Sequence, residues 1–256
     1  MSTQFLIQSS DPALFEKATQ VAKEFAQQYI NDDIVGIVFL GAIARGYFDR
    51  SADIDIALFK KQASEISMPD KFLKIDGFEV QCWVSDYESE LVNPWDMSRR
   101  WTYSHGQVYY DPAGKISQLL QEKVPLKPEE KKWLMMSGLT LSEWYINGLT
   151  ELWIERGNMV SAHHMFNQGL NYFFEMLFGL NNQLVADMKW RYYCVEKLER
   201  LPRNFRERIK DILLLHSISL EELERRKKAF MEIWQEMKPI VEEEVQMSFD
   251  EMVQVV

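Results

Sequence analysis

The chain has 256 residues, enough for one large domain or two ordinary ones, and 46% hydrophobic with 27% charged residues is a globular composition rather than a disordered or fibrous one. Its formal net charge of -10 repels phosphate backbones, so we do not expect a nucleic-acid partner. No signal peptide and no apolar run of membrane-spanning length is recognisable, and Cys82 and Cys194 lie in apolar stretches. We therefore expect a soluble cytoplasmic protein with reduced thiols and no membrane partner.

The first half of the sequence alternates between helical and strand patterns. Asp11-Pro12 is a typical helix start, with Asp as cap and Pro at the first helical position. The apolar residues that follow recur at helical spacing through Phe25. Apolar or alternating runs then predict four strands, at 34–40, 54–59, 78–84 and 107–110.

From about Lys127 onward the sequence predicts helices without a convincing strand. Helical periodicity runs through 133–156, 160–177 and 185–198, and Ser219 with Glu222 forms a capping-box pattern before a long terminal helix. We therefore predict an α+β fold in which an α/β domain with a mixed sheet, residues 1–125, precedes a helical bundle domain, residues 126–256.

The chemistry-bearing pattern is a glycine at the end of the first strand followed by two aspartates on the second. Gly41 allows a tight turn and close approach to a phosphate. Asp53 and Asp55 are two residues apart, so they share one strand face at roughly 7 Å spacing. Two carboxylates beside a phosphate-binding turn suit magnesium.

This stretch resembles the DNA polymerase β-like nucleotidyltransferase superfamily, whose signature is matched by Gly41, Arg45-Gly46, Ser51, Asp53 and Asp55. The resemblance implies a catalytic N-terminal domain that uses two Mg2+ ions and an NTP, expected to be ATP. The implied nucleotide-binding residues are Gly41, Ala42, Arg45 and Ser51. Ala42 stands where the family usually has Ser, which predicts weakened nucleotide binding.

The superfamily also implies a third carboxylate on a neighbouring strand. Glu79 is our candidate, as a catalytic residue and metal ligand with Asp53 and Asp55. The alternative is a solvated strand glutamate, in which case Asp76 or Asp86 takes the role.

A stretch at 110–115 before the helical half is similar to the kanamycin and lincosamide adenylyltransferases, which are antibiotic-resistance enzymes. This resemblance implies a general base from the helical domain, for which we select the catalytic candidate Glu143, with Glu151 in reserve. Glu143 could equally lie on a solvated helix face. A homodimer, with the site in a cleft between domains, is expected by the same analogy.

The sequence thus predicts transfer of a nucleoside monophosphate to a hydroxyl of a small acceptor, such as an aminoglycoside- or lincosamide-like compound. The alternatives are adenylylation of a protein partner, a catalytically weakened nucleotide-binding regulatory protein, and a helical interaction module. Adjacent histidines diverge on a helix, so His163-His164 is interpreted as structural, as is His105. The cluster at 187–191 is left as either a ligand contact or a helix start.

Overall fold

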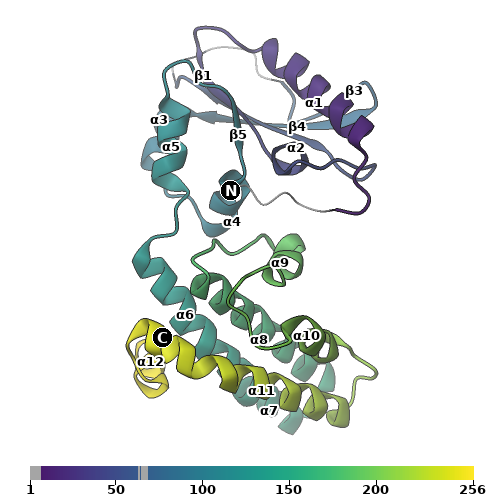
Figure 1. Ribbon diagram of the computed structural model, residues 1–256, viewed down its shortest axis with the longest axis vertical. Coiled ribbons are helices and arrows are strands. Elements are labelled where there is room, and N and C mark those ends of the chain that lie inside the picture. Colours follow the sequence, from purple (N-terminus) through teal and green to yellow (C-terminus); the bar gives the residue numbers. More distant parts are fainter. Residues whose placement is uncertain (1–6, 63, 65–68) are drawn as a thin grey trace. The chain divides into compact units, whose positions relative to one another are not determined.

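The computed structural model describes residues 7–62, 64 and 69–256. The chain divides into two compact units, Met1–Pro125 and Leu126–Val256 (Figure 1). The first unit contains a mixed sheet with helices, and the second is helical in its described elements. The predicted α+β class, a mixed-sheet domain followed by helices, is confirmed.

The sheet of the first unit has the strand order β3-β4-β2-β1-β5. Its strands are β1 (Ile34–Phe39), β2 (Ile54–Lys60), β3 (Phe72–Ile75), β4 (Phe78–Asp86) and β5 (Gln107–Tyr110). β2 and β4 are parallel, whereas β1 pairs antiparallel with both β2 and β5, and β3 pairs antiparallel with β4. The parallel pair matters for function because it carries the candidate acidic residues on adjacent strands.

Helices in this unit are α1 (Pro12–Gln27), α2 (Gly41–Arg45), α3 (Tyr87–Val92), α4 (Met97–Ser104) and α5 (Lys115–Lys123). α1 begins as predicted, since the Asp11 carboxylate accepts a hydrogen bond from the Ala13 amide at 2.8 Å. One face of β1 and β2 packs against aromatic and aliphatic side chains from α3, α4 and α5, including Tyr87, Tyr103 and Ile116. This core holds the two strands that precede and follow the Gly41 turn.

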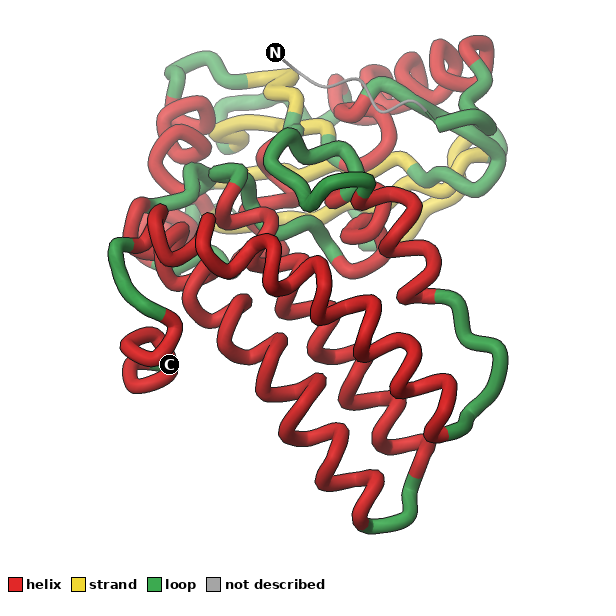
Figure 2. Tube along the Cα trace, turned by 60° about the horizontal axis from the view of Figure 1, so that its bottom comes forward, coloured by secondary structure: helices red, strands yellow, loops and turns green. Residues whose placement is uncertain are grey.

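The second unit consists of helical segments joined by short connections. They are α6 (Pro128–Glu143), the π-helical η1 (Trp144–Leu149), α7 (Thr150–Glu155), α8 (Met159–Leu180), α9 (Met188–Val195), α10 (Phe205–Leu213), α11 (Leu220–Val245) and α12 (Phe249–Val255). The long helices lie side by side (Figure 2). Among the described residues, no helix combines the length and apolar character that a bilayer crossing requires.

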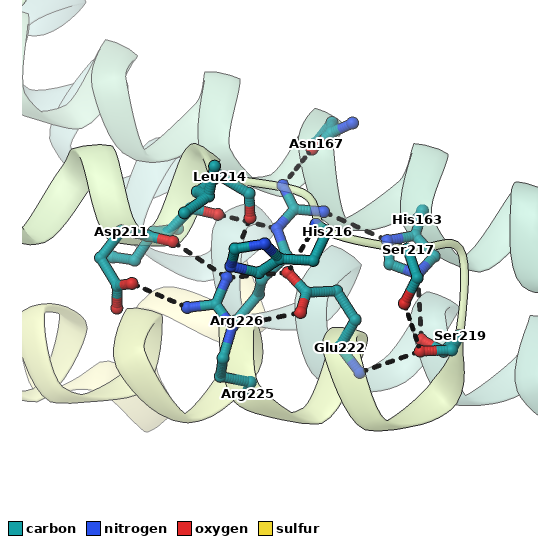
Figure 3. A network of polar contacts seen from close by, with 11 residues as sticks. His163, Asn167, Asp211, Leu214, His216, Ser217, Ser219, Glu222, Arg225 and Arg226 are labelled. Carbon is teal, nitrogen blue, oxygen red and sulfur yellow. Dashed lines mark hydrogen bonds and ion pairs between the residues drawn. The ribbon is translucent and has the colours of Figure 1, made fainter.

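A polar network fixes the connection between α10 and α11 (Figure 3). Arg226 is 1% exposed and donates to the Ile212 carbonyl at 2.7 Å and to Asn167 Oδ1 at 2.7 Å. Its third contact is His163 Nδ1 at 3.2 Å, while His163 Nε2 reaches the Ser219 carbonyl, also at 3.2 Å. His163 thus lies between a guanidinium, which can only donate, and a carbonyl, which can only accept.

Candidate functional site

The turn after β1 brings the backbone directly against a carboxylate. Leu40 still donates its amide to the Asp55 carbonyl at 2.9 Å, so the chain stays attached to β2 as it enters α2. Gly41 has φ 55°, in the left-handed region. A Cβ at this position would lie 1.9 Å from Asp55 Oδ2, which is far inside van der Waals contact. Glycine is therefore required here by both backbone conformation and space.

Asp53 and Asp55 flank the start of β2 and share a face, as the sequence predicts. Ile54 and Ile56, which alternate with them, are completely buried. Asp53 and Asp55 are half-buried. In the parallel register, Asp55 lies beside Gln81 of β4. Gln81 also donates a hydrogen bond through Nε2 to Asp53 Oδ2, so a single amide side chain connects the two aspartate positions.

Tyr47 shows the electrostatic effect of these carboxylates. Burial first, and then the negative charges of Asp49, Asp53 and Asp55, raise the pKa of its hydroxyl to about 12, although the positive charge of Arg45 opposes the shift. Charges affect a pKa only over a short distance, so the two carboxylates and Arg45 all lie near the Tyr47 hydroxyl. The site thus has a negative pole at the start of β2 and a cation close by.

The side chains of α2 are largely turned into the protein. Ala42 is 4% exposed and Arg45 is 6% exposed. The Arg45 guanidinium lies 4.3 Å from the centre of the Trp101 ring, a cation–π contact that joins α2 to α4. Arg45 therefore has a direct role in packing, and its contribution to nucleotide binding stays a prediction. Ser51 is exposed in the turn before β2, where its amide donates to Asp49 Oδ1 at 2.8 Å.

Next to this cation lies His105, which follows α4. Burial, and after it the charge of Arg45, lower the pKa of His105 to about 4. Its Nδ1 is 2.9 Å from Ser104 Oγ, and its ring meets that of Trp101 edge-on at 6.1 Å. His105 is thus a neutral ring at physiological pH.

Glu79 has a different environment from the aspartates. It is exposed on β4, and its partner in the antiparallel register with β3 is Lys74. Within the described part of the chain, no group of three or more His, Cys, Asp or Glu side chains is arranged to hold a metal ion. The structure therefore brings Asp53 and Asp55 together with Gln81, and it does not add Glu79 to form a three-carboxylate cluster.

The two substitutes for Glu79 lie elsewhere on the sheet. Asp76 is exposed in the turn between β3 and β4, with φ 50°. Asp86 is at the far end of β4, where it forms an ion pair with Lys60 at 2.7 Å. Neither residue is adjacent to Asp53 in the register of the sheet.

Glu143 belongs to the helical unit and ends α6. Its Oε1 accepts a hydrogen bond from Asn147 Nδ2 at 2.9 Å, and Asn147 also contacts Met231 Sδ at 3.5 Å. The π-helical turn begins at the next residue, a feature that is frequent at functional sites. Glu151, the reserve candidate, forms an ion pair with Lys227.

Another polar group of the helical unit joins α8 to α9. Arg191 pairs with Glu175 at 3.1 Å, while Asp187 caps α9 through the Lys189 amide. Burial raises the pKa of Glu175 even though Arg191 opposes the shift. Within the cluster at 187–191, Asp187, Lys189 and Arg191 therefore have structural roles. His163 is buried in the network of Figure 3, whereas His164 is exposed, so the two rings do diverge.

Sequence reasoning missed Gln81 because an amide between Glu79 and Cys82 carries no charge signal. Its place beside Asp55 follows only from the register of β2 with β4. The alternation of β4 puts Gln81 on the same face of the strand as Glu79, and this is the signal by which the sequence could have identified it.

No protein-family model matches the chain, and no curated protein matches it. Among solved structures, the chain is similar to a nucleotidyltransferase-like protein from Exiguobacterium sibiricum 255-15. The identity is 12% and the TM-score is 0.47, over 89% of this chain and 77% of that one. An identity and a TM-score this low carry no argument about function.

Proposed function

We propose that this chain is a magnesium-dependent nucleotidyltransferase that transfers a nucleoside monophosphate, expected to be AMP from ATP, to a hydroxyl group of a small acceptor. The observation that carries the proposal is the contact of the Gly41 backbone with Asp55, together with Asp53 on the same face of the strand. This arrangement offers two carboxylates beside a backbone turn that phosphate can approach closely.

The donor set fits magnesium. One or two carboxylates, completed by waters and substrate phosphates, are its usual protein environment. Asp53 and Asp55 would hold the ion, and the backbone at Gly41 and Ala42 would lie against the phosphates. When bound, magnesium neutralises the triphosphate and the charge that develops on it during transfer.

In the proposed reaction the acceptor oxygen forms a bond to the α-phosphorus of the NTP. The bond from that phosphorus to the oxygen bridging to the β-phosphate breaks, and pyrophosphate leaves. The hydroxyl proton passes to a general base, for which we propose Glu143. Its hydrogen bond from Asn147 supports this role because it holds the carboxylate in one orientation.

The acceptor class is proposed from the resemblance to kanamycin and lincosamide enzymes. A cationic, hydroxylated compound is compatible with the net charge of -10, which attracts cations over the surface as a whole. A homodimer is proposed from the resemblance to the kanamycin enzymes, and two ions from the resemblance to the wider superfamily. A cytoplasmic location is proposed from the two cysteines, which lie in apolar stretches.

Two substitutions favour a second candidate function, a nucleotide-binding regulatory protein with weakened transfer. Ala42 lacks the hydroxyl that the superfamily usually presents at the turn. Gln81, an amide, lies beside the aspartates where a third carboxylate would strengthen metal binding. Such a protein would bind nucleotide without releasing pyrophosphate.

The first test is thermal unfolding of the full chain with each NTP, with and without Mg2+. A ligand that binds only the folded state stabilises it, by about 2.7 kcal/mol at a hundred times Kd. We expect a magnesium-dependent rise of the midpoint that Asp53→Asn and Asp55→Asn each remove. Asp76→Asn is the matched control, because Asn tolerates a positive φ and this carboxylate is exposed. An equal rise in all variants would contradict the proposal.

Pyrophosphate release with a panel of acceptors then separates transfer from binding. Glu143→Gln is expected to slow transfer by roughly 10²–10⁴-fold, because a positioned base contributes about that much, while the thermal shift with magnesium and nucleotide is kept. Nucleotide binding with no pyrophosphate for any acceptor would favour the regulatory candidate. Label transfer to a macromolecule would favour adenylylation of a protein.

A further inference from the structure

Gln81 neighbours Asp55 in the sheet and contacts Asp53. The β2–β4 register places its Cα beside that of Asp55, and its Nε2 donates to Asp53 Oδ2. It is half-buried, whereas Glu79 on the same strand is exposed. Side chains paired across parallel strands point to the same face, so Gln81 shares the face on which the two carboxylates lie.

A primary amide differs from a carboxylate in what it can do at this position. It has one NH2 donor and one neutral carbonyl oxygen. The NH2 orients Asp53, as the hydrogen bond shows. Oε1 is then the only oxygen that Gln81 can offer to a cation, and magnesium accepts neutral oxygen ligands as well as carboxylates.

We propose that Gln81, rather than Glu79, is the third member of the cation site, as the residue that orients Asp53 and offers a neutral oxygen ligand. This inference rests on the proposed function and adds a property to it. Two carboxylates and an amide carry two negative charges, which one divalent ion neutralises. The free protein therefore binds a single divalent cation weakly, and a further ion enters only with the phosphates of the nucleotide.

The charge count explains why the affinity of the free site is low. A third carboxylate beside a divalent ion would strengthen the Coulomb attraction that holds the ion. Gln81 omits that charge. In return, Asp53 and Asp55 are spared the repulsion of a third negative group when no cation is bound.

The test is Mn2+ binding to the full-length protein without nucleotide, measured by the electron paramagnetic resonance signal of free Mn2+. Gln81→Glu is expected to raise the affinity at least about tenfold, because it adds a carboxylate beside the ion. Gln81→Ala is expected to lower it by about tenfold, a usual cost of losing a residue that orients a metal ligand. Glu79→Gln is the matched control and is expected to leave the affinity unchanged.

Two outcomes overturn the inference in different ways. If Glu79→Gln lowers Mn2+ affinity and both Gln81 variants match the wild type, Glu79 is the ligand and the proposed function survives. If Asp53→Asn and Asp55→Asn also leave Mn2+ affinity unchanged, the proposed function fails together with the inference. Should Gln81→Glu not fold, as judged by circular dichroism, the comparison of Gln81→Ala with Glu79→Gln still decides.

Discussion

Gly41 is the residue at which backbone conformation and site chemistry meet. Its φ of 55° disfavours any residue with a side chain. So does the distance of only 1.9 Å that would separate an added Cβ from Asp55 Oδ2. Gly41→Ala is expected to destabilise the sheet unit by about 1–3 kcal/mol, the usual cost of such strain. It is also expected to abolish the magnesium-dependent thermal shift with nucleotide, because the Asp55 carboxylate must move away.

Gly114→Ala provides the control for backbone strain without the steric clash. Gly114 also has a positive φ, 69°, but nothing lies within 4 Å of its built Cβ. This variant is expected to lose stability and keep the full nucleotide shift. If both alanine variants keep the shift, contact of the Gly41 turn with Asp55 has no part in binding.

His105 links the site to pH. Its pKa is lowered to about 4, by burial first and by Arg45 second, whereas an unfolded histidine titrates near 6.5. Below pH about 6.5 the unfolded chain binds a proton that the folded chain refuses, so stability falls as pH drops from about 6.5 towards 4. Urea unfolding at several pH values should show this slope, and His105→Gln should reduce it.

The protonation of the His105 ring can also be measured directly. In a proton NMR titration, the His105 Cε1 proton is expected to keep the shift of a neutral ring down to pH about 5. A midpoint near 6.5 would mean that the ring is solvated in the folded state and that burial does not set its charge.

Among single residues, the sequence identified those whose role follows from local pattern. Asp53 and Asp55 share a face because they are two apart, and Gly41 takes a positive φ where the chain has left β1, at the first residue of α2. The inward position of Arg45 depends on Trp101, more than fifty residues later, and that of Gln81 on strand register. Contacts between distant segments do not appear in local periodicity.

At the scale of elements, buried or alternating apolar runs predicted four of the five strands of the sheet. Of these, β5 coincides with the predicted 107–110. β3 was missed because it is a short edge strand whose Phe72 is 65% exposed and whose Lys74 interrupts the apolar pattern. Edge strands often carry such features, which blunt their sequence signal.

The capping box before α11 was half correct. Ser219 Oγ accepts the Glu222 amide at 3.3 Å, as a cap should. The Glu222 carboxylate instead accepts from the His216 amide, in the connection before α11, and from Arg225, three residues later on α11. These two donors thus take the place of the Ser219 amide (Figure 3).

Arg226 makes the packing of α11 on α8 and α10 testable. Arg226→Met removes the donor to the carbonyl of the buried Ile212 and to Oδ1 of the exposed Asn167, so the Ile212 carbonyl loses this partner inside the protein. We expect a loss of about 1–3 kcal/mol in the unfolding free energy of the helical unit, the usual cost of a buried acceptor that loses its donor. Arg225→Met, one residue away at a 33% exposed side chain, is expected to cost clearly less. Equal losses would show that burial is not the cause.

The whole molecule is built from two compact units that meet in sequence between Pro125 and Leu126. Each unit has its own buried core, in the first around β1 and β2 and in the second around residues such as Phe173 and Phe230. Units with separate cores unfold as separate cooperative transitions unless their interface couples them. The proposed cation and nucleotide ligands all belong to the first unit, and the proposed general base, Glu143, belongs to the second.

Hydrogen exchange measured by mass spectrometry can therefore assign stability to each unit. Magnesium with ATP is expected to slow exchange in peptides covering β1, α2 and β2, while Arg226→Met is expected to speed exchange only within the second unit. In Arg226→Met with magnesium and ATP, both changes in exchange should be seen together, since each acts on the unfolding of a different unit. If Arg226→Met also speeds exchange in β1 and β2, the units unfold together, and nucleotide bound to the first must then stabilise the second as well.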